Sequence, residues 1–343
     1  MEEYKEAFKA QSIGGLKTGT AFEEWVLCGF FACPCFFLWY VFANLLLRSH
    51  YGLYSGITMK KSKIRYSILA LATAFMLFQL LIGNAYAISN GVPDGNDHPY
   101  VCWIVTYDGA SDYVFLGSGS LIAQNVVLTA GHVTNDAGGQ PIAYAWVSFS
   151  PTASWPPWAG GGDWIAVVGL GTHPLYNMGG AKGITDWLTY DVGILILSED
   201  VSLAEYAELP SLGQVNTLPM KQNLELVGYG VQYQVRGAGI PPSGNWNWID
   251  FGWRYQTQSE LIASNNVMSE QFIRVTANPA QGKGGTCFGD SGSPILLAGT
   301  NTIVGVCSWG TNGNCAGVSY DQRIDIPEIL PWILAMVEVF SGA

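Results

Sequence analysis

A glycine-rich segment around Ser291 is the part of the chain best suited to chemistry. Residues 284–294 read Gly-Gly-Thr-Cys-Phe-Gly-Asp-Ser-Gly-Ser-Pro. Glycines on both sides of the serine allow a tight turn with backbone angles that other residues avoid. Such a turn exposes one hydroxyl and directs successive N–H groups at one point, which suits a nucleophile beside an oxyanion-binding site. A Gly/Ser loop alone is more often an ordinary connection, so this interpretation needs partners elsewhere.

Two other segments contain the partners that a serine nucleophile requires. Residues 128–132 read Leu-Thr-Ala-Gly-His, and residues 190–197 read Tyr-Asp-Val-Gly-Ile-Leu-Ile-Leu. A serine hydroxyl is a weak nucleophile until a base removes its proton. His132 is the candidate base, and Asp191 is the candidate group that orients its imidazole and stabilises the imidazolium.

In these contexts and in this order, the three residues resemble the catalytic triad of the chymotrypsin/trypsin family of serine endopeptidases. The order of triad residues along the chain differs among unrelated folds, so it distinguishes this family from the α/β-hydrolases. The resemblance runs from about residue 88 to about residue 332. It implies catalytic His132, Asp191 and Ser291, an oxyanion hole formed by the N–H groups of Gly289 and Ser291, protein or peptide substrates, and no cofactor.

The resemblance also implies a specificity pocket. Its predicted residues are Gly285, Thr286, Ser308, Gly310 and Gly317. Gly285 stands where a trypsin-like enzyme carries an aspartate, so cleavage after Arg or Lys is disfavoured. We expect cleavage after large hydrophobic or aromatic residues.

Cysteines at the positions of Cys287 and Cys315 are bridged in the family, so we expect that disulfide here. Val133 follows His132 where the family often has a cysteine, so the bridge beside the histidine is missing. Burial as free thiols is the commoner fate of unpaired cysteines such as Cys102 and Cys307, but the sequence leaves their pairing open.

Two apolar segments precede the motifs. Residues 25–47 are uncharged and long enough for a transmembrane helix. Residues 59–87 have a methionine, a basic stretch, an apolar stretch and the small-x-small sequence Ala-Tyr-Ala, as in a secretory signal peptide. We favour translation from Met59, a secreted protein (extracellular or periplasmic), and residues 1–58 as a doubtful extension. The alternative is a membrane-tethered protease anchored by residues 25–47.

Cleavage after Ala87 would make Ile88 the new N-terminus. Residues 88–91, Ile-Ser-Asn-Gly, resemble the mature start of the family, whose α-amine turns inward and pairs with the acid beside the catalytic serine, here Asp290. A buried carboxylate without a partner is costly, so this pair would hold the oxyanion loop in its working shape. Signal peptidase would then release the active terminus directly.

From residue 100 onward, short β-branched and aromatic runs alternate with Gly, Pro, Asn and Asp, which is typical of an all-β barrel or sandwich. With the resemblance, this predicts a serine protease domain over 88–343 made of two six-stranded antiparallel β-barrels. The first barrel is expected at about 100–205 and the second at about 215–325. A C-terminal helix is expected at about 326–338, packed on the second barrel.

Composition limits the remaining partners. Charged residues make up 12% of the chain and the net charge is −11, which argues against a nucleic-acid partner. The four histidines lie far apart without a second ligand at a usual spacing, so we expect no metal site. We expect a monomer. A catalytically silent binding or adhesion module remains the rival interpretation.

Overall fold

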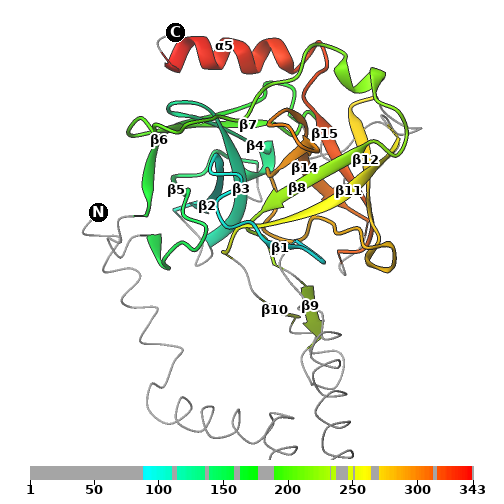
Figure 1. The fold of residues 1–343 in the computed structure, drawn as a ribbon. Coiled ribbons are helices and arrows are strands. Elements are labelled where there is room, and N and C mark those ends of the chain that lie inside the picture. Colours follow the sequence, from blue (N-terminus) through cyan, green and yellow to red (C-terminus); the bar gives the residue numbers. More distant parts are fainter. Residues whose placement is uncertain are drawn as a thin grey trace, which may run out of the picture. The chain divides into compact units, whose positions relative to one another are not determined.

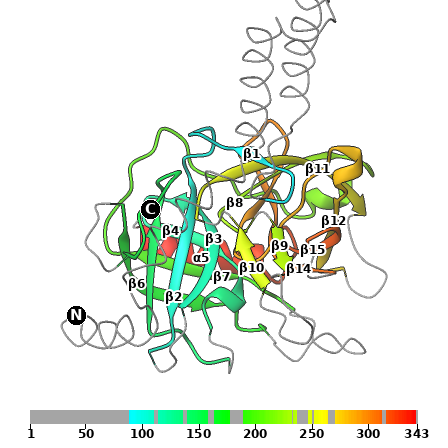
Figure 2. The ribbon, with the colours of Figure 1, turned by 90° about the horizontal axis from the view of Figure 1, so that it is seen from below.

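Two antiparallel β-barrels lie side by side (Figures 1 and 2). The computed structural model describes residues 88–109, 114–135, 139–157, 163–176, 189–231, 233–236, 246–249, 252–263, 270–311 and 315–341. The predicted extension, transmembrane segment and signal peptide lie outside these residues. Within the described part, no helix has the length and apolar character needed to cross a membrane.

The first barrel is a closed sheet with strand order β2-β3-β4-β7-β6-β5. Its strands are β2 (Val101–Tyr107), β3 (Val114–Ala123), β4 (Val126–Thr129), β5 (Tyr144–Ser148), β6 (Ile165–Thr172) and β7 (Gly193–Leu197). Strands β4 and β7 are buried along their whole length. Such strands read as continuous apolar runs, which is how they appear in the sequence.

The second barrel closes through the order β11-β12-β15-β14-β13-β8, because β8 also pairs with β11. Its strands are β8 (Asn223–Gly228), β11 (Tyr255–Ala263), β12 (Phe272–Ala277), β13 (Pro294–Leu297), β14 (Ile303–Gly310) and β15 (Gly317–Arg323). The short strand β1 (Val92–Pro93) pairs with β11, and β9 (Tyr233–Arg236) and β10 (Trp246–Ile249) form a separate hairpin. The predicted fold class, two six-stranded antiparallel barrels with a C-terminal helix, is therefore confirmed.

The C-terminal helix α5 (Leu330–Ser341) begins later than predicted and packs on the other barrel. Pro331 lacks an N–H and is tolerated only in the first turn of a helix, which fixes the start near Leu330. The helix contacts β3, β4 and β7 of the first barrel, above which it lies in Figure 1. Ile333 belongs to the core of that barrel and Trp332 packs against it, so the expectation of packing on the second barrel was wrong.

Arg254 joins the two barrels from the start of β11. Its side chain is fully buried, and its Nε donates to Asp94 Oδ2 at 2.7 Å. Its Nη1 donates to the carbonyl oxygens of Val101 at 3.1 Å and Phe149 at 3.0 Å, both in the first barrel. This cation therefore fixes the N-terminal segment and the first barrel to the second.

Candidate active site

His132 and Asp191 are brought together by two neighbouring strands. His132 lies in the 3₁₀ turn Gly131–Val133 directly after β4, and Asp191 lies just before β7. Strands β4 and β7 are antiparallel, with Thr129 opposite Gly193. The end of one strand and the start of the other therefore meet at the same edge of the barrel, which places the imidazole beside the carboxylate.

The Asp191 carboxylate holds His132 at two points. Asp191 Oδ1 accepts a hydrogen bond from the backbone N–H of His132 at 2.8 Å, and Oδ2 lies 2.8 Å from His132 Nδ1. Asp191 is fully buried, whereas the His132 side chain is 24% exposed. Burial alone would lower the pKa of His132, but the charge of Asp191 and its hydrogen bond raise it. An imidazole held with its Nδ1 proton toward Asp191 leaves Nε2 as the proton acceptor.

Ser291 lies on the tight turn that the glycines predicted. Gly292, the next residue, has a φ of +86°, and a Cβ there would collide with Thr129. The carbonyl oxygen of Ser291 accepts a hydrogen bond from the N–H of Ser118 at 2.8 Å. Only glycine fits this conformation and this close approach to the first barrel.

One cavity of about 430 Å³, here called the histidine-side cavity, joins the predicted catalytic groups. Its lining residues include His132, Phe288, Gly289, Ser291 and Trp155. The structure therefore places the candidate base and nucleophile from the two barrels on one cavity. Trp155 was not among the predicted site residues, because aromatic residues in such Trp-rich segments more often serve packing.

The peptide group between Phe288 and Gly289 has a defined orientation. The carbonyl oxygen of Phe288 accepts a hydrogen bond from the N–H of Val231 at 2.8 Å. Since a trans peptide directs its N–H opposite to its C=O, the Gly289 N–H points away from Val231. Gly289 has a φ of +95°, and its carbonyl oxygen accepts from Ser118 Oγ at 2.9 Å. In the described part of the chain, no acceptor bonds to the N–H of Gly289 or Ser291.

Asp290 points into the protein interior rather than toward the cavities. Its Oδ1 accepts from the N–H of Gly230 and its Oδ2 from the N–H of Cys287, both at 2.8 Å. Burial raises the pKa of Asp290 to about 7, although the two N–H donors oppose this. Among the described residues, no basic side chain forms an ion pair with it.

The predicted activation terminus, Ile88, is not among the hydrogen-bond partners of Asp290 in the described part of the chain. Ile88 is fully buried in the core of the second barrel. The adjacent Ser89 forms a β-bridge with Gly285, and its hydroxyl donates to the carbonyl oxygen of Cys315 at 3.0 Å.

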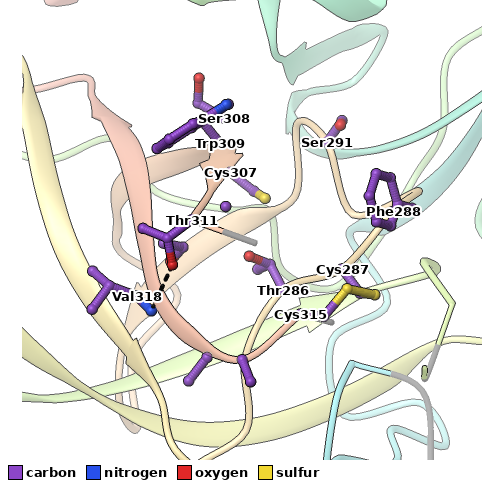
Figure 3. Close-up of a pocket in the computed structure, with 14 residues that line it drawn as sticks. Thr286, Cys287, Phe288, Ser291, Cys307, Ser308, Trp309, Thr311, Cys315 and Val318 are labelled. Carbon is purple, nitrogen blue, oxygen red and sulfur yellow. Dashed lines mark hydrogen bonds between the residues drawn. A yellow bond between two sulfur atoms is a disulfide. The ribbon is translucent and has the colours of Figure 1, made fainter. Parts of the chain in front are cut away.

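A second cavity, of about 310 Å³, also borders Ser291 and is here called the disulfide-side cavity (Figure 3). Of the predicted pocket residues, Thr286, Ser308 and Gly310 line this cavity, together with Ser291, Cys287 and Cys315. Gly285 and Gly317 are not among its lining residues. A Cβ on Gly285 would collide with Ala277, so residue 285 faces that wall residue rather than the cavity.

The cysteines of the described residues form one disulfide and two free thiols. Cys287 and Cys315 form the predicted disulfide, which closes a loop with a sequence separation of 28. Cys102 and Cys307 are buried free thiols. Burial strongly raises the pKa of both thiols, so neither is a reactive thiolate at neutral pH.

Within the described residues, no group of three or more His, Cys, Asp or Glu side chains is placed to hold a metal ion.

Comparisons with known proteins show the family to which the chain belongs. The family model described as Trypsin matches residues 93–333. Serine protease 1 and Serine protease 2 of Drosophila melanogaster are each 27% identical over 255 residues, covering 72% of this chain and 84% of the relative. The solved structure of HL collagenase is 17% identical, with a TM-score of 0.55, and the match covers 74% of this chain and 99% of that one, which supports the fold. The chain therefore belongs to the trypsin family of chymotrypsin-like serine endopeptidases.

Proposed function

We propose that this enzyme hydrolyses peptide bonds with Ser291 as nucleophile, His132 as general base and acid, and Asp191 as the group that orients the base. The observation that carries the proposal is the pair of contacts from Asp191 to His132, each of 2.8 Å. His132 in turn shares a cavity with Ser291. An imidazole fixed through its Nδ1 proton has Nε2 free to take a proton from an alcohol.

The reaction divides into acylation and deacylation. His132 Nε2 takes the Ser291 hydroxyl proton while Oγ bonds to the scissile carbonyl carbon, and the imidazolium then gives this proton to the leaving amine as the C–N bond breaks. A water molecule, deprotonated by His132, attacks the resulting ester, and the proton returns to Ser291 Oγ as the acid product leaves. Asp191 stabilises the imidazolium in both halves.

The N–H groups of Gly289 and Ser291 would stabilise the oxyanion of the tetrahedral intermediate. In support, the hydrogen bond from Val231 to the Phe288 carbonyl oxygen turns the Gly289 N–H away from Val231, and neither N–H is used by another described residue. Loss of one such donor costs about 10²–10³ in rate in serine proteases.

An ammonium group released at Ile88 would pair with Asp290 and stabilise this loop. Asp290 is fully buried with only N–H donors among the described residues, and burial of an uncompensated carboxylate is unfavourable. The bridge between Ser89 and Gly285 already holds the new terminus beside the segment that contains Asp290. N-terminal sequencing of the active protein should give Ile-Ser-Asn-Gly; a start well after Ile88 would reject this step.

The proposed substrates carry a large hydrophobic or aromatic residue before the scissile bond. None of the residues lining the disulfide-side cavity is Asp, Glu, Lys or Arg. Ala277 and Val318 form apolar parts of its wall. Burial of an apolar side chain there would supply binding free energy. Best turnover after Arg or Glu would reject this preference.

We also propose secretion through the signal peptide at 59–87, which the structural disulfide supports because such bridges persist in oxidising compartments. Recovery of the protein from the medium without residues 1–87 would favour this over a membrane tether.

The proposal is tested by labelling with a fluorophosphonate and by peptide hydrolysis. We expect stoichiometric labelling that is lost in Ser291→Ala, and a fall in kcat of about 10⁴ in Asp191→Asn, which keeps the shape of the side chain but not its charge. A correctly processed protein that is neither labelled nor able to cleave any peptide would instead be a silent binding module.

A further inference from the structure

A carboxylate that the triad does not use lies next to the disulfide-side cavity. Ser319 on β15 lines this cavity, and Asp321 is two positions further along the same strand. Side chains two positions apart lie on the same face of a strand. The Asp321 side chain is fully buried, and the hydroxyl of Ser319 donates to its Oδ2 at 2.7 Å. Asp321 is not itself among the lining residues, so it lies behind Ser319.

The direction of this hydrogen bond decides what the cavity offers to a substrate. A hydroxyl has one proton and two lone pairs, so a serine that donates to Asp321 can only accept from the cavity side. The carboxylate behind it has the Ser319 hydroxyl and the backbone N–H of Ser308 as donors, and its Oδ1 has no hydrogen bond within the described part of the chain. Burial raises the pKa of Asp321 to about 7, and above that pH the group is a desolvated anion. This end of the cavity is therefore a hydrogen-bond acceptor.

The other walls are mainly apolar. Ala277, Val318, Phe288 and the disulfide contribute hydrocarbon and sulfur surface. A side chain with an apolar body and one hydrogen-bond donor at its end would satisfy both parts of the cavity. An ammonium or guanidinium group needs several acceptors and a direct contact with a carboxylate. Asp321 is separated from the cavity by the Ser319 hydroxyl, so the fit to a phenol is better.

We infer that Ser319, supported by Asp321, makes the disulfide-side cavity select tyrosine over phenylalanine as the residue before the scissile bond. The inference rests on the proposed peptidase function and narrows its substrate class. Ser319 is the specificity-determining residue, and Asp321 is a positioning residue that fixes the direction of the Ser319 hydroxyl.

The experiment compares peptides that differ only in the residue before the scissile bond: Tyr, Phe, Leu or Lys. It uses active protein obtained from the full-length chain, at a pH at which Asp321 is ionised. We expect kcat/KM to be about tenfold higher for Tyr than for Phe, the effect of one buried hydrogen bond. Ser319→Ala should bring the ratio close to one. Asp321→Asn should reduce it partly, because the amide oxygen still accepts from Ser319 but without a charge.

Ser259→Ala is the matched control. Ser259 is also a buried serine of the second barrel, on β11, but its hydroxyl donates to the carbonyl oxygen of Thr276 and does not line the cavity. Its removal should leave the Tyr/Phe ratio unchanged. Since each ratio is measured within one protein, a lower active fraction in a variant does not affect it.

The possible failures are distinguishable. Equal turnover of the Tyr and Phe peptides by the wild-type enzyme, a preference for Lys, or an unchanged ratio in Ser319→Ala and Asp321→Asn would overturn the inference. Normal fluorophosphonate labelling in the same samples would leave the triad proposal intact. Absence of both labelling and peptide cleavage in wild-type protein that begins at Ile88 would overturn the proposed function itself.

Discussion

The Ser308 hydroxyl of the second barrel donates a 2.5 Å hydrogen bond to Asp191 of the first barrel. The accepting atom, Oδ2, is the same oxygen that lies 2.8 Å from His132 Nδ1. The second barrel also provides Gln322, whose Oε1 accepts from the backbone N–H of Asp191 at 3.1 Å. The orientation of the candidate base in one barrel therefore depends on side chains of the other.

Ser308→Ala should lower kcat/KM for peptides by about tenfold. A hydrogen bond to a charged group contributes about 1.5–3 kcal/mol, and repacking of neighbouring side chains around the alanine should recover part of this free energy. The measurement is steady-state kinetics normalised to the fluorophosphonate-labelled fraction. Ser211→Ala, which removes an exposed hydroxyl bonded to Gln214, is the control and should leave kcat/KM unchanged. Full activity in Ser308→Ala would contradict a role for this contact in placing Asp191.

The pH dependence of catalysis should follow His132. Asp191 raises the pKa of His132 above its ordinary value of 6.5, despite the opposing effect of burial. General base catalysis requires the neutral imidazole, so kcat/KM should fall as the pH drops through a midpoint above 6.5. Nuclear magnetic resonance titration of His132 in the Ser291→Ala protein should give the same midpoint. A midpoint below 6.5, or one that Asp191→Asn does not lower, would contradict this assignment.

Asp321→Asn should stabilise the protein above neutral pH. Burial raises the pKa of Asp321 from 3.8 to about 7 in the folded state, so the folded protein binds a proton more tightly than the unfolded chain. Stability is therefore lost as the pH rises between these values, and an uncharged amide avoids the loss. A gain of about 1 kcal/mol would raise Tm by about 2–4 °C in a domain of this size. The gain should be absent below pH 3.8, where the carboxyl is protonated in both states.

Asp200→Asn, which changes an exposed carboxylate, is the control for that experiment and should leave Tm nearly unchanged at every pH. If Asp321→Asn and the wild type have the same Tm above neutral pH, the ionised Asp321 carboxylate does not destabilise the folded protein, and the prediction is wrong.

Arg254→Met should destabilise the protein by about 3 kcal/mol, since it removes the cation from Asp94 Oδ2 and leaves this buried carboxylate with His98 as its basic partner. The paired atoms, Arg254 Nε and Asp94 Oδ2, lie 2.7 Å apart and both side chains are fully buried. Urea unfolding measures the loss. The double variant Arg254→Met with Asp94→Asn should recover part of it, because the side chain that has lost Arg254 is then uncharged. A single variant as stable as the wild type would contradict this account.

The residues that meet around Ser291 were predicted from local motifs, and the two barrels and the disulfide from the family that these motifs resemble. The motifs are a histidine after a buried strand, an aspartate before another, and a serine between glycines. The antiparallel register of β4 and β7 then brings His132 and Asp191 together, with Thr129 opposite Gly193.

Features that depend on which face of an element meets which neighbour were not predicted. The helix α5 is apolar enough to pack on either barrel, and only the fold shows that Ile333 enters the first. Gly285 and Gly317 were placed in the pocket by resemblance, but a residue at 285 would face Ala277. The pair Ser319 and Asp321 was missed, although its spacing on one strand face was visible in the sequence.

Ser118 links the shape of the Ser291 turn to the docking of the two barrels. This first-barrel residue donates to the carbonyl oxygens of both Gly289 and Ser291, which lie much later in the chain. Neither barrel alone supplies both His132 and Ser291 to the histidine-side cavity. That cavity is therefore complete only after the strands of the second barrel, which are synthesised last, have packed against the first.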